Sequence, residues 1–136
     1  MRAMLMTAAF VLTAATMGAA QTAGQAASPG IEVSEAVLAT GVEIREPVGV
    51  ATSFPADVGT VYFYTVFEGE FDELTLHHVW LRGEEEVARV PLRVRGPRWR
   101  TWSSKRIPPE WSGRWTVQVM AADGQVLWSV DFTVGT

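Results

Sequence analysis

Residues 115–134 read WTVQVMAADGQVLWSVDFTV, and apolar and polar side chains alternate in both halves of this segment. Such alternation is typical of β-strands with one buried face, because successive side chains point to opposite sides. Asp123-Gly124 lies between the two halves and predicts a hairpin with a two-residue turn. Trp115 and Trp128 lie on the apolar faces of the two strands, so we expect them to sit in one hydrophobic core.

Five other segments are rich in aromatic and β-branched residues and are bounded by turn residues, as strands are. They are residues 33–39, 61–67, 74–81, 87–94 and 98–103. The segment VYFYTVF (61–67) is apolar on both faces, which indicates a strand covered on two sides. Pro91 cannot donate to a ladder, so the strand that contains it is expected at a sheet edge or next to a bulge.

About seven short strands, with no convincing amphipathic helix after residue 20, predict an all-β protein. At this length we expect an immunoglobulin-like antiparallel β-sandwich. The chain has no cysteine, so the likeness to immunoglobulin domains would be one of architecture alone.

The first twenty residues have the features of a secretory signal peptide. Arg2 gives a positive start, residues 4–17 are apolar or small, and Gly18-Ala19-Ala20 is a small-residue cleavage site. The expected divisions are a signal peptide over 1–20, a flexible lead over 21–30 and a single β-sandwich domain over 31–136. This organisation predicts a periplasmic or secreted protein with no membrane span after cleavage, and the alternative is an uncleaved anchor.

Charge is unevenly distributed along the 136 residues, whose formal net charge is −4. Residues 31–86 contain twelve acids and two bases, whereas residues 87–136 contain three acids and eight bases. Two explanations are open: solvated strand faces with cross-strand ion pairs, or a basic patch for an anionic partner. The acidic total and the predicted export argue against a nucleic-acid partner.

Large aromatic and basic side chains alternate in residues 96–105, which read GPRWRTWSSK. On a strand, Arg98, Arg100 and Trp102 share one face, and Lys105 follows closely. In a structural interpretation an arginine stacks on Trp102 and pairs with a carboxylate from the acidic half. In a functional interpretation the four residues form a platform for a sugar ring, a peptidoglycan strand or an acidic partner. Arg98, Arg100, Trp102 and Lys105 are therefore the candidate ligand-binding residues.

The same block belongs to a wider set of motifs. These are His78-Val79-Trp80, residues 96–105, Gly113-x-Trp115-x-Val117 and Asp123-Gly124-x-Val126-Leu127. Together they resemble the domain-of-unknown-function family 2914, and segments 40–47 and 61–63 resemble stretches upstream of that domain. Ile44 departs from the pattern, because a polar residue is expected there. The resemblance implies export and a small β-domain, and it implies no activity and no catalytic residues.

Catalytic and metal-binding patterns are weak in this sequence. His77 and His78 would face opposite sides of a strand and could not share a metal. The acidic turn at 68–73 lacks the spacing of a calcium loop. Ser103 and Ser104 lack a Gly-x-Ser-x-Gly elbow, and nothing favours a triad of serine, His78 and an acid.

We therefore predict a protein that is not an enzyme and uses no cofactor and no metal. The expected function is an exported binding or scaffolding module of the bacterial envelope, which meets an envelope protein. The alternative is a glycan- or peptidoglycan-binding module that uses the same tryptophan and arginine face.

Overall fold

The computed structural model describes residues 30–135, and in this part of the chain ten β-strands and one short 3-10 helix, Pro109–Trp111, are present. The strands are β1 (Glu32–Ala39), β2 (Gly41–Glu43), β3 (Glu46–Val48), β4 (Ser53–Phe54), β5 (Gly59–Glu68), β6 (Leu74–Arg82), β7 (Glu85–Val94), β8 (Arg98–Ile107), β9 (Gly113–Ala121) and β10 (Val126–Val134). Seven of them have eight to ten residues and correspond to the seven predicted strands. The short strands β2, β3 and β4 were not predicted.

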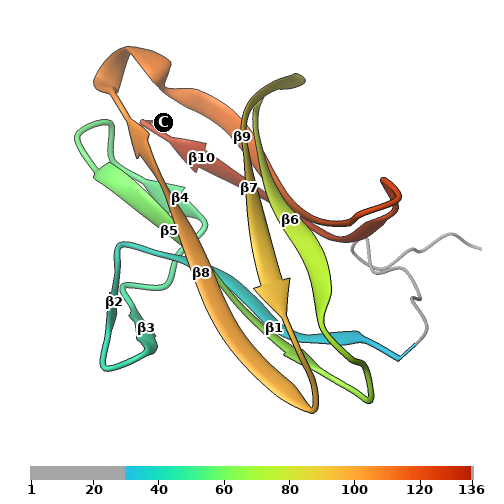
Figure 1. The fold of residues 1–136 in the computed structure, drawn as a ribbon. Coiled ribbons are helices and arrows are strands. Elements are labelled where there is room, and N and C mark those ends of the chain that lie inside the picture. The colour runs from blue at the N-terminus through green and yellow to red at the C-terminus, as the bar shows by residue number, and fades with distance from the viewer. Residues whose placement is uncertain (1–29, 136) are drawn as a thin grey trace, which may run out of the picture.

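The strands form two large sheets that pack as a sandwich, and a separate two-stranded ribbon (Figure 1). The first sheet has the order β1-β5-β8, the second has the order β4-β10-β9-β6-β7, and the ribbon is β2-β3. All pairs are antiparallel except the two-residue contact between β4 and β10. β7, which contains Pro91, lies at a sheet edge as predicted. The antiparallel β-sandwich is confirmed, and immunoglobulin-like connectivity stays a prediction.

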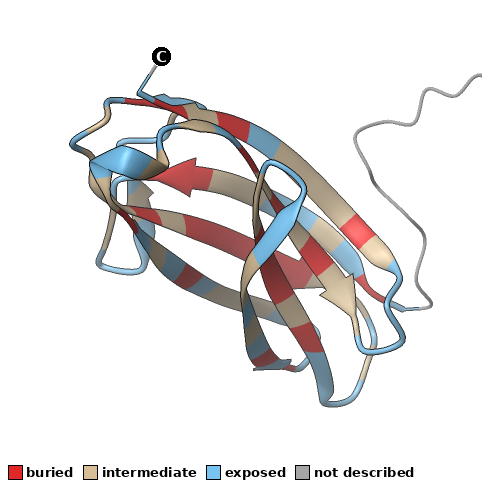
Figure 2. Cartoon of the chain, turned by 90° about the horizontal axis from the view of Figure 1, so that it is seen from above, coloured by how far each residue is buried: buried red, intermediate tan, exposed pale blue. Residues whose placement is uncertain are grey.

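The hydrophobic core fills the space between the sheets, and buried residues recur along most of the long strands (Figure 2). Aromatic rings dominate it. Phe132 contacts Trp80 edge to face, with ring centroids 6.2 Å apart, and stacks on Trp115 at 5.9 Å. Trp115 is fully buried and Trp128 is partly buried against the same cluster, so the prediction that they share one core is confirmed.

The hairpin between β9 and β10 differs in detail from the predicted two-residue turn. Its loop has three residues, because the Ala121 N–H bonds to the Gln125 carbonyl and the Gly124 N–H bonds back to the Ala121 carbonyl. Gly124 has a φ of 93°, the left-handed conformation that closes such loops. The register also shifts between Val126 and Trp128, so that Leu127 is buried as well.

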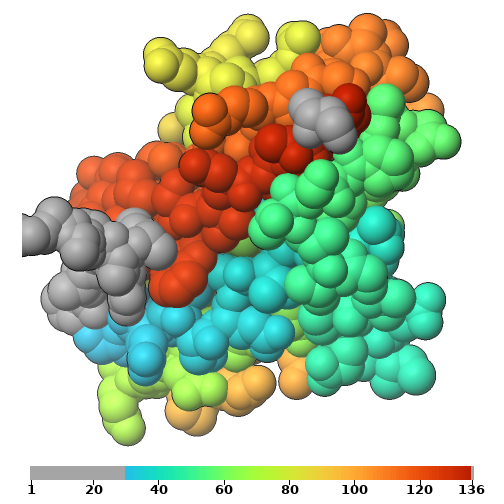
Figure 3. Space-filling model, turned by 180° about the vertical axis from the view of Figure 1, so that it is seen from behind, coloured from blue at the N-terminus to red at the C-terminus, as the bar shows by residue number. Residues whose placement is uncertain are grey.

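The β2–β3 ribbon lies beside the β1–β5–β8 sheet, and Figure 3 shows it next to β1 on the back of the molecule. The same view shows β1 alongside β10, where the two sheets meet at that side of the sandwich. A two-residue turn, Ile44-Arg45, joins β2 to β3, and both residues have positive φ, of 50° and 64°. Ile44 is 94% exposed at the tip of the ribbon.

The predicted signal peptide over 1–20 and nearly all of the lead over 21–30 lie outside the described residues. Within residues 30–135, no helix has the length and apolar character that crossing a bilayer requires.

Candidate functional site

The outer face of the β1–β5–β8 sheet carries three of the four candidate residues. β5 is apolar on both faces: Phe63 points into the core, while Tyr64 and Val66 on the outer face are also buried. The register places Trp102 of β8 opposite Tyr64, and the two rings stack with centroids 5.9 Å apart and planes 15° apart. Trp102 remains 36% exposed, so its indole shields Tyr64 on one side and meets solvent on the other.

The β2–β3 ribbon is fastened over this face by one carbonyl group. The Tyr64 hydroxyl donates to the Arg45 carbonyl at 2.8 Å, and Arg100 Nη1 donates to the same oxygen at 3.1 Å. Burial raises the pKa of Tyr64, which keeps this hydroxyl protonated as a donor. A left-handed backbone costs about 1–2 kcal/mol for a residue with a Cβ, so these two bonds help to hold Ile44 and Arg45 in a turn that neither residue favours.

The arginines of β8 are partly neutralised by carboxylates, as the structural interpretation predicted. Its other part is wrong: the ring of Tyr64 stacks on Trp102, and no arginine among the described residues does. Arg98 forms an ion pair with Glu68 at 2.9 Å, and Arg100 lies 3.7 Å from Glu46. Exposed pairs of this kind contribute little to stability, but they restrict where the guanidinium groups point. Arg45 has no ion pair within the described part of the chain.

Two overlapping hollows run along β8 between these side chains. One, of about 410 Å³, is lined by Arg45, Arg98, Trp99 and Arg100. The other, of about 470 Å³, shares Arg45, Trp99 and Arg100 and adds Arg93, Thr101 and Trp102. We call the combined hollow the β8 groove. Four arginines line it, which makes it suitable for an anionic partner.

Lys105 does not join this face, and this part of the site prediction is wrong. β8 runs from Arg98 to Ile107 without a register shift, so odd-numbered residues point to the other side of the sheet. Lys105 instead places its Nζ 5.3 Å from the centre of the Trp111 ring, and Arg82 lies 5.1 Å from the same ring. The pairing of β8 with β5 continues through Ser103 and Ser104 without a break, so no irregularity turns Lys105 back to the outer face.

Sequence reasoning also missed Tyr64, Arg45 and Glu46 as parts of this site. The sequence did contain an indication of the role of Tyr64, because a strand that is apolar on both faces must have its outer face covered by other residues. In the structure Trp102 and the β2–β3 ribbon cover that face at Tyr64. Neither proposed interpretation is complete by itself. Arg98 and Arg100 are tied to acids, while Trp102 is partly open to solvent.

A second polar cluster lies buried between the two sheets. His78 on β6 contacts Ser103 on β8 through Nδ1 at 2.7 Å and Thr65 on β5 through Nε2 at 3.1 Å. The Thr65 hydroxyl donates to the Thr101 carbonyl at 3.0 Å, so Thr65 accepts the proton of Nε2. Trp80 Nε1 donates to Ser103 at 3.2 Å, and the Ser103 hydroxyl therefore donates to Nδ1. These directions are assigned from the network, in which each side-chain donor has one acceptor.

This arrangement fixes His78 in its neutral form. Both ring nitrogens are used and the ring is fully buried, and desolvation lowers the pKa of His78 to about 3. The contact between Ser103 and His78 resembles part of a nucleophilic dyad, but Nε2 faces Thr65 where a triad would have a carboxylate. The cluster joins the two sheets of a chain that has no disulfide.

Other places hold weaker candidates. His77 lies on the opposite face of β6 from His78, as predicted, and its buried Nδ1 has no hydrogen-bond partner among the described residues. Residues 30–135 contain no group of three or more His, Cys, Asp or Glu side chains arranged to hold a metal ion.

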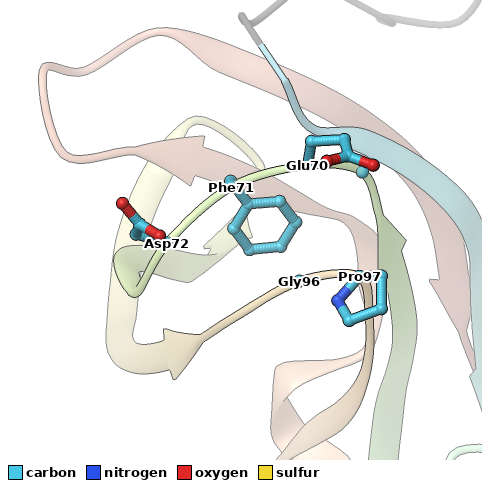
Figure 4. A pocket seen from close by; sticks show the side chains of 6 residues that line it. Glu70, Phe71, Asp72, Gly96 and Pro97 are labelled. Carbon is cyan, nitrogen blue, oxygen red and sulfur yellow. The ribbon is translucent and has the colours of Figure 1, made fainter.

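A further hollow, of about 500 Å³, lies where the 69–72 loop meets Gly96 and Pro97, and Figure 4 shows the Phe71 ring between them. A Cβ at Gly96 would collide with the Gly69 carbonyl, and a Cβ at Gly69 would collide with the Gly30 carbonyl. We call this contact between three segments of main chain the glycine junction. The hollow beside it is a by-product of that close approach.

The fold and the site define a class: a small antiparallel β-sandwich with a buried polar link between its sheets and a basic, aromatic outer face. Residues 73–134, from just before β6 to the end of β10, match the family model described as "Protein of unknown function (DUF2914)". Over these residues the resemblance found in the motifs of the second half of the chain is confirmed. Segments 40–47 and 61–63 lie outside the matched region. No curated protein matches the chain.

Similar solved structures are domains within much longer enzymes. A β-glucosidase from Listeria innocua in complex with glucose has a TM-score of 0.44 and 9% identity, over 78% of this chain and 16% of that chain. A GH3 β-glucosidase from Bifidobacterium adolescentis has a TM-score of 0.45 and 8% identity, over 77% of this chain and 17% of that chain. A β-glucosidase from Kluyveromyces marxianus has a TM-score of 0.46 and 9% identity, over 79% of this chain and 14% of that chain. The chain thus spans about a sixth of these enzymes, and at such scores the likeness carries no argument about function.

Proposed function

We propose that this protein is an exported, non-enzymatic binding module of the bacterial envelope, and that the β8 groove meets a partner protein. The features of residues 1–20 support export, and the outer face of the β1–β5–β8 sheet supports binding. The partner surface would be acidic where it faces Arg45, Arg98 and Arg100.

One observation carries the proposal: Trp102 is held in place by Tyr64 and is still 36% exposed. A partly open indole beside arginines is the composition found at the centres of protein interfaces, where tryptophan and arginine contribute most to affinity. Glu68 and Glu46 restrict the flanking guanidinium groups, so binding would cost little further side-chain order.

The test compares Trp102→Ala with a matched control, Leu74→Ala. Leu74 is 37% exposed, so both substitutions remove a half-open apolar side chain, but Leu74 lies at the start of β6 and does not line the groove. Immobilised mature domain is used to capture partners from envelope extracts, and thermal melting is measured for each variant. We expect Trp102→Ala to lose the captured partner with only a modest fall in melting temperature, because Tyr64 loses part of its cover, and Leu74→Ala to retain the partner. Capture that is equal in wild type and Trp102→Ala, or a large fall in melting temperature of Trp102→Ala, contradicts the proposal.

A glycan or peptidoglycan strand is the second candidate, because the open face of Trp102 suits the CH face of a sugar ring and arginines suit its carboxylates. The same two variants on an array of glycans and peptidoglycan fragments decide between the candidates. Binding of a fragment that depends on Trp102 favours the glycan.

A further inference from the structure

The two large sheets end in four edge strands, and three of them are protected against pairing. β7 contains Pro91, and its register with β6 shifts opposite Trp80 and Leu81 of that strand. The register of β1 with β5 shifts between Val33 and Glu35. β4 is only two residues long. Proline, bulges and short length are three means by which proteins block strand addition, and charged side chains are a fourth. β8 has none of the first three, because its ten residues contain no proline and pair with β5 in unbroken register. Its protection is its positive charge, which opposes cationic strands and not acidic ones.

The backbone of β8 presents alternate residues to the open edge. The Thr101 carbonyl accepts from the Thr65 side chain of β5, and the Pro97 carbonyl accepts from the Gly69 N–H at the end of β5. Odd-numbered residues of β8 therefore direct their polar groups toward β5, and even-numbered ones direct theirs away. The N–H and C=O groups of Arg100, Trp102 and Ser104 thus face the open edge of the sheet.

The β8 groove lies at this edge and not on either face alone. Its lining includes Arg100 and Trp102, which point outward, and Trp99 and Thr101, which point to the other side. A hollow bounded by both sets of side chains runs along the backbone between them. Arg93 of β7 borders it across the gap between the sheets.

We infer, on the basis of the function proposed above, that β8 accepts an extended acidic segment of a partner protein as an additional antiparallel strand. Main-chain hydrogen bonds would provide affinity, and alternate side chains would provide specificity. Arg98, Arg100 and Arg106 share the outer face of β8, so acidic residues at alternate positions of the segment would lie opposite them, with an aromatic residue opposite Trp102.

The same cations decide against a second copy of this chain as the occupant. A β8 strand from another molecule would bring Arg98, Arg100, Lys105 and Arg106 next to an identical set, and like charges facing each other across strands are destabilising. Charge complementarity therefore selects an acidic partner segment.

The test uses a fluorescent, end-capped probe peptide, Glu-Thr-Thr-Thr-Tyr-Thr-Glu-Thr-Glu, whose tyrosine is designed to lie opposite Trp102 and whose last two glutamates lie opposite Arg100 and Arg98. Binding to the mature domain is measured by fluorescence anisotropy. A probe with lysine in place of glutamate tests charge. Two N-methylated probes test the backbone: one carries the methyl groups on the amides designed to face β8, at tyrosine and the following glutamate, and the other carries them on the threonines on either side of the tyrosine.

We expect the acidic probe to bind and the lysine probe not to bind. Methyl groups on the β8-facing amides should weaken binding about tenfold or more, while those on the threonines should have little effect, because only the first set removes hydrogen bonds to the strand. Ser104→Pro should also abolish binding, since it removes one N–H from the open edge, whereas Ser104→Ala should retain it. The methylated probes leave the protein unchanged, so they decide the question even when Ser104→Pro is unstable.

Absence of probe binding, or equal loss with both methylation patterns, overturns strand addition. Either result leaves the function proposed above standing wherever partner capture depends on Trp102. Conversely, capture that is independent of Trp102 contradicts the proposed function, whatever the probe does.

Discussion

The buried ring of His78 should make the stability of this domain depend on pH well above the range in which carboxylates are protonated. Desolvation lowers the pKa of His78 from 6.5 to about 3 in the folded state. The unfolded chain therefore binds a proton at His78 between these two values and the folded chain does not. Stability from this residue is present above pH 6.5 and is lost as the pH falls toward 3.

The size of the effect follows from the two pKa values. Each pH unit below 6.5 lowers the free energy of unfolding by about 1.4 kcal/mol. Between pH 7 and pH 5 the free energy of unfolding should therefore fall by about 2 kcal/mol. That is a large part of the 5–15 kcal/mol typical of a domain. pH 5 is a suitable lower limit, because most carboxylates are still ionised there.

Urea unfolding followed by tryptophan fluorescence at pH 7 and pH 5 measures this difference. His78→Gln should be less stable than wild type at pH 7, because the bonds to Ser103 and Thr65 are disturbed, but it should lose much less between the two pH values. His77→Gln, on the opposite face of β6, is the matched control and should show the wild-type fall. A wild-type stability that is equal at both pH values, or an equal fall in His78→Gln, refutes the assignment of a neutral buried His78.

Two other predictions concern the core and the processing of the chain. Trp115→Ala should lower the free energy of unfolding by about 3–5 kcal/mol, because Trp115 is fully buried against Phe132, and a thermal melt equal to that of wild type would show that this strand face is not packed as described. Mass spectrometry of the protein expressed in a Gram-negative host should find an N-terminus at or near Gln21, and an intact Met1 in the envelope fraction would mean that the segment is kept as an anchor.

The strands and their faces could be predicted from the sequence because they depend on local alternation. Trp115 and Pro91 lie where the pattern placed them, in the core and on an edge strand. The burial of Leu127 could not be predicted in this way, because it results from a one-residue register shift that no local sequence pattern marks.

The site was predictable only where it depends on one strand. Arg98, Arg100 and Trp102 share a face by simple alternation, and the same alternation places Lys105 on the other side. The remaining parts depend on which strands become neighbours. The contact of Arg45 with Tyr64 joins residues nineteen positions apart.

The buried cluster has the same origin. Ser103 and His78 are twenty-five positions apart and lie on different sheets, so their hydrogen bond is fixed by strand order. Periodicity carries no information about such pairs, because it describes one strand at a time.

The glycine junction determines where this protein can be modified for experiments. Gly30, Gly69 and Gly96 bring three stretches of main chain together with no room for a Cβ, so a dye, an affinity handle or an inserted loop there would separate the beginnings of β1 and β8 from the end of β5. The opposite end of β6 is open: a Cβ at Gly83 would meet no atom within 4 Å. Attachment beside Gly83, in the hairpin between β6 and β7, would leave both the outer face and the β8 edge free for measurement.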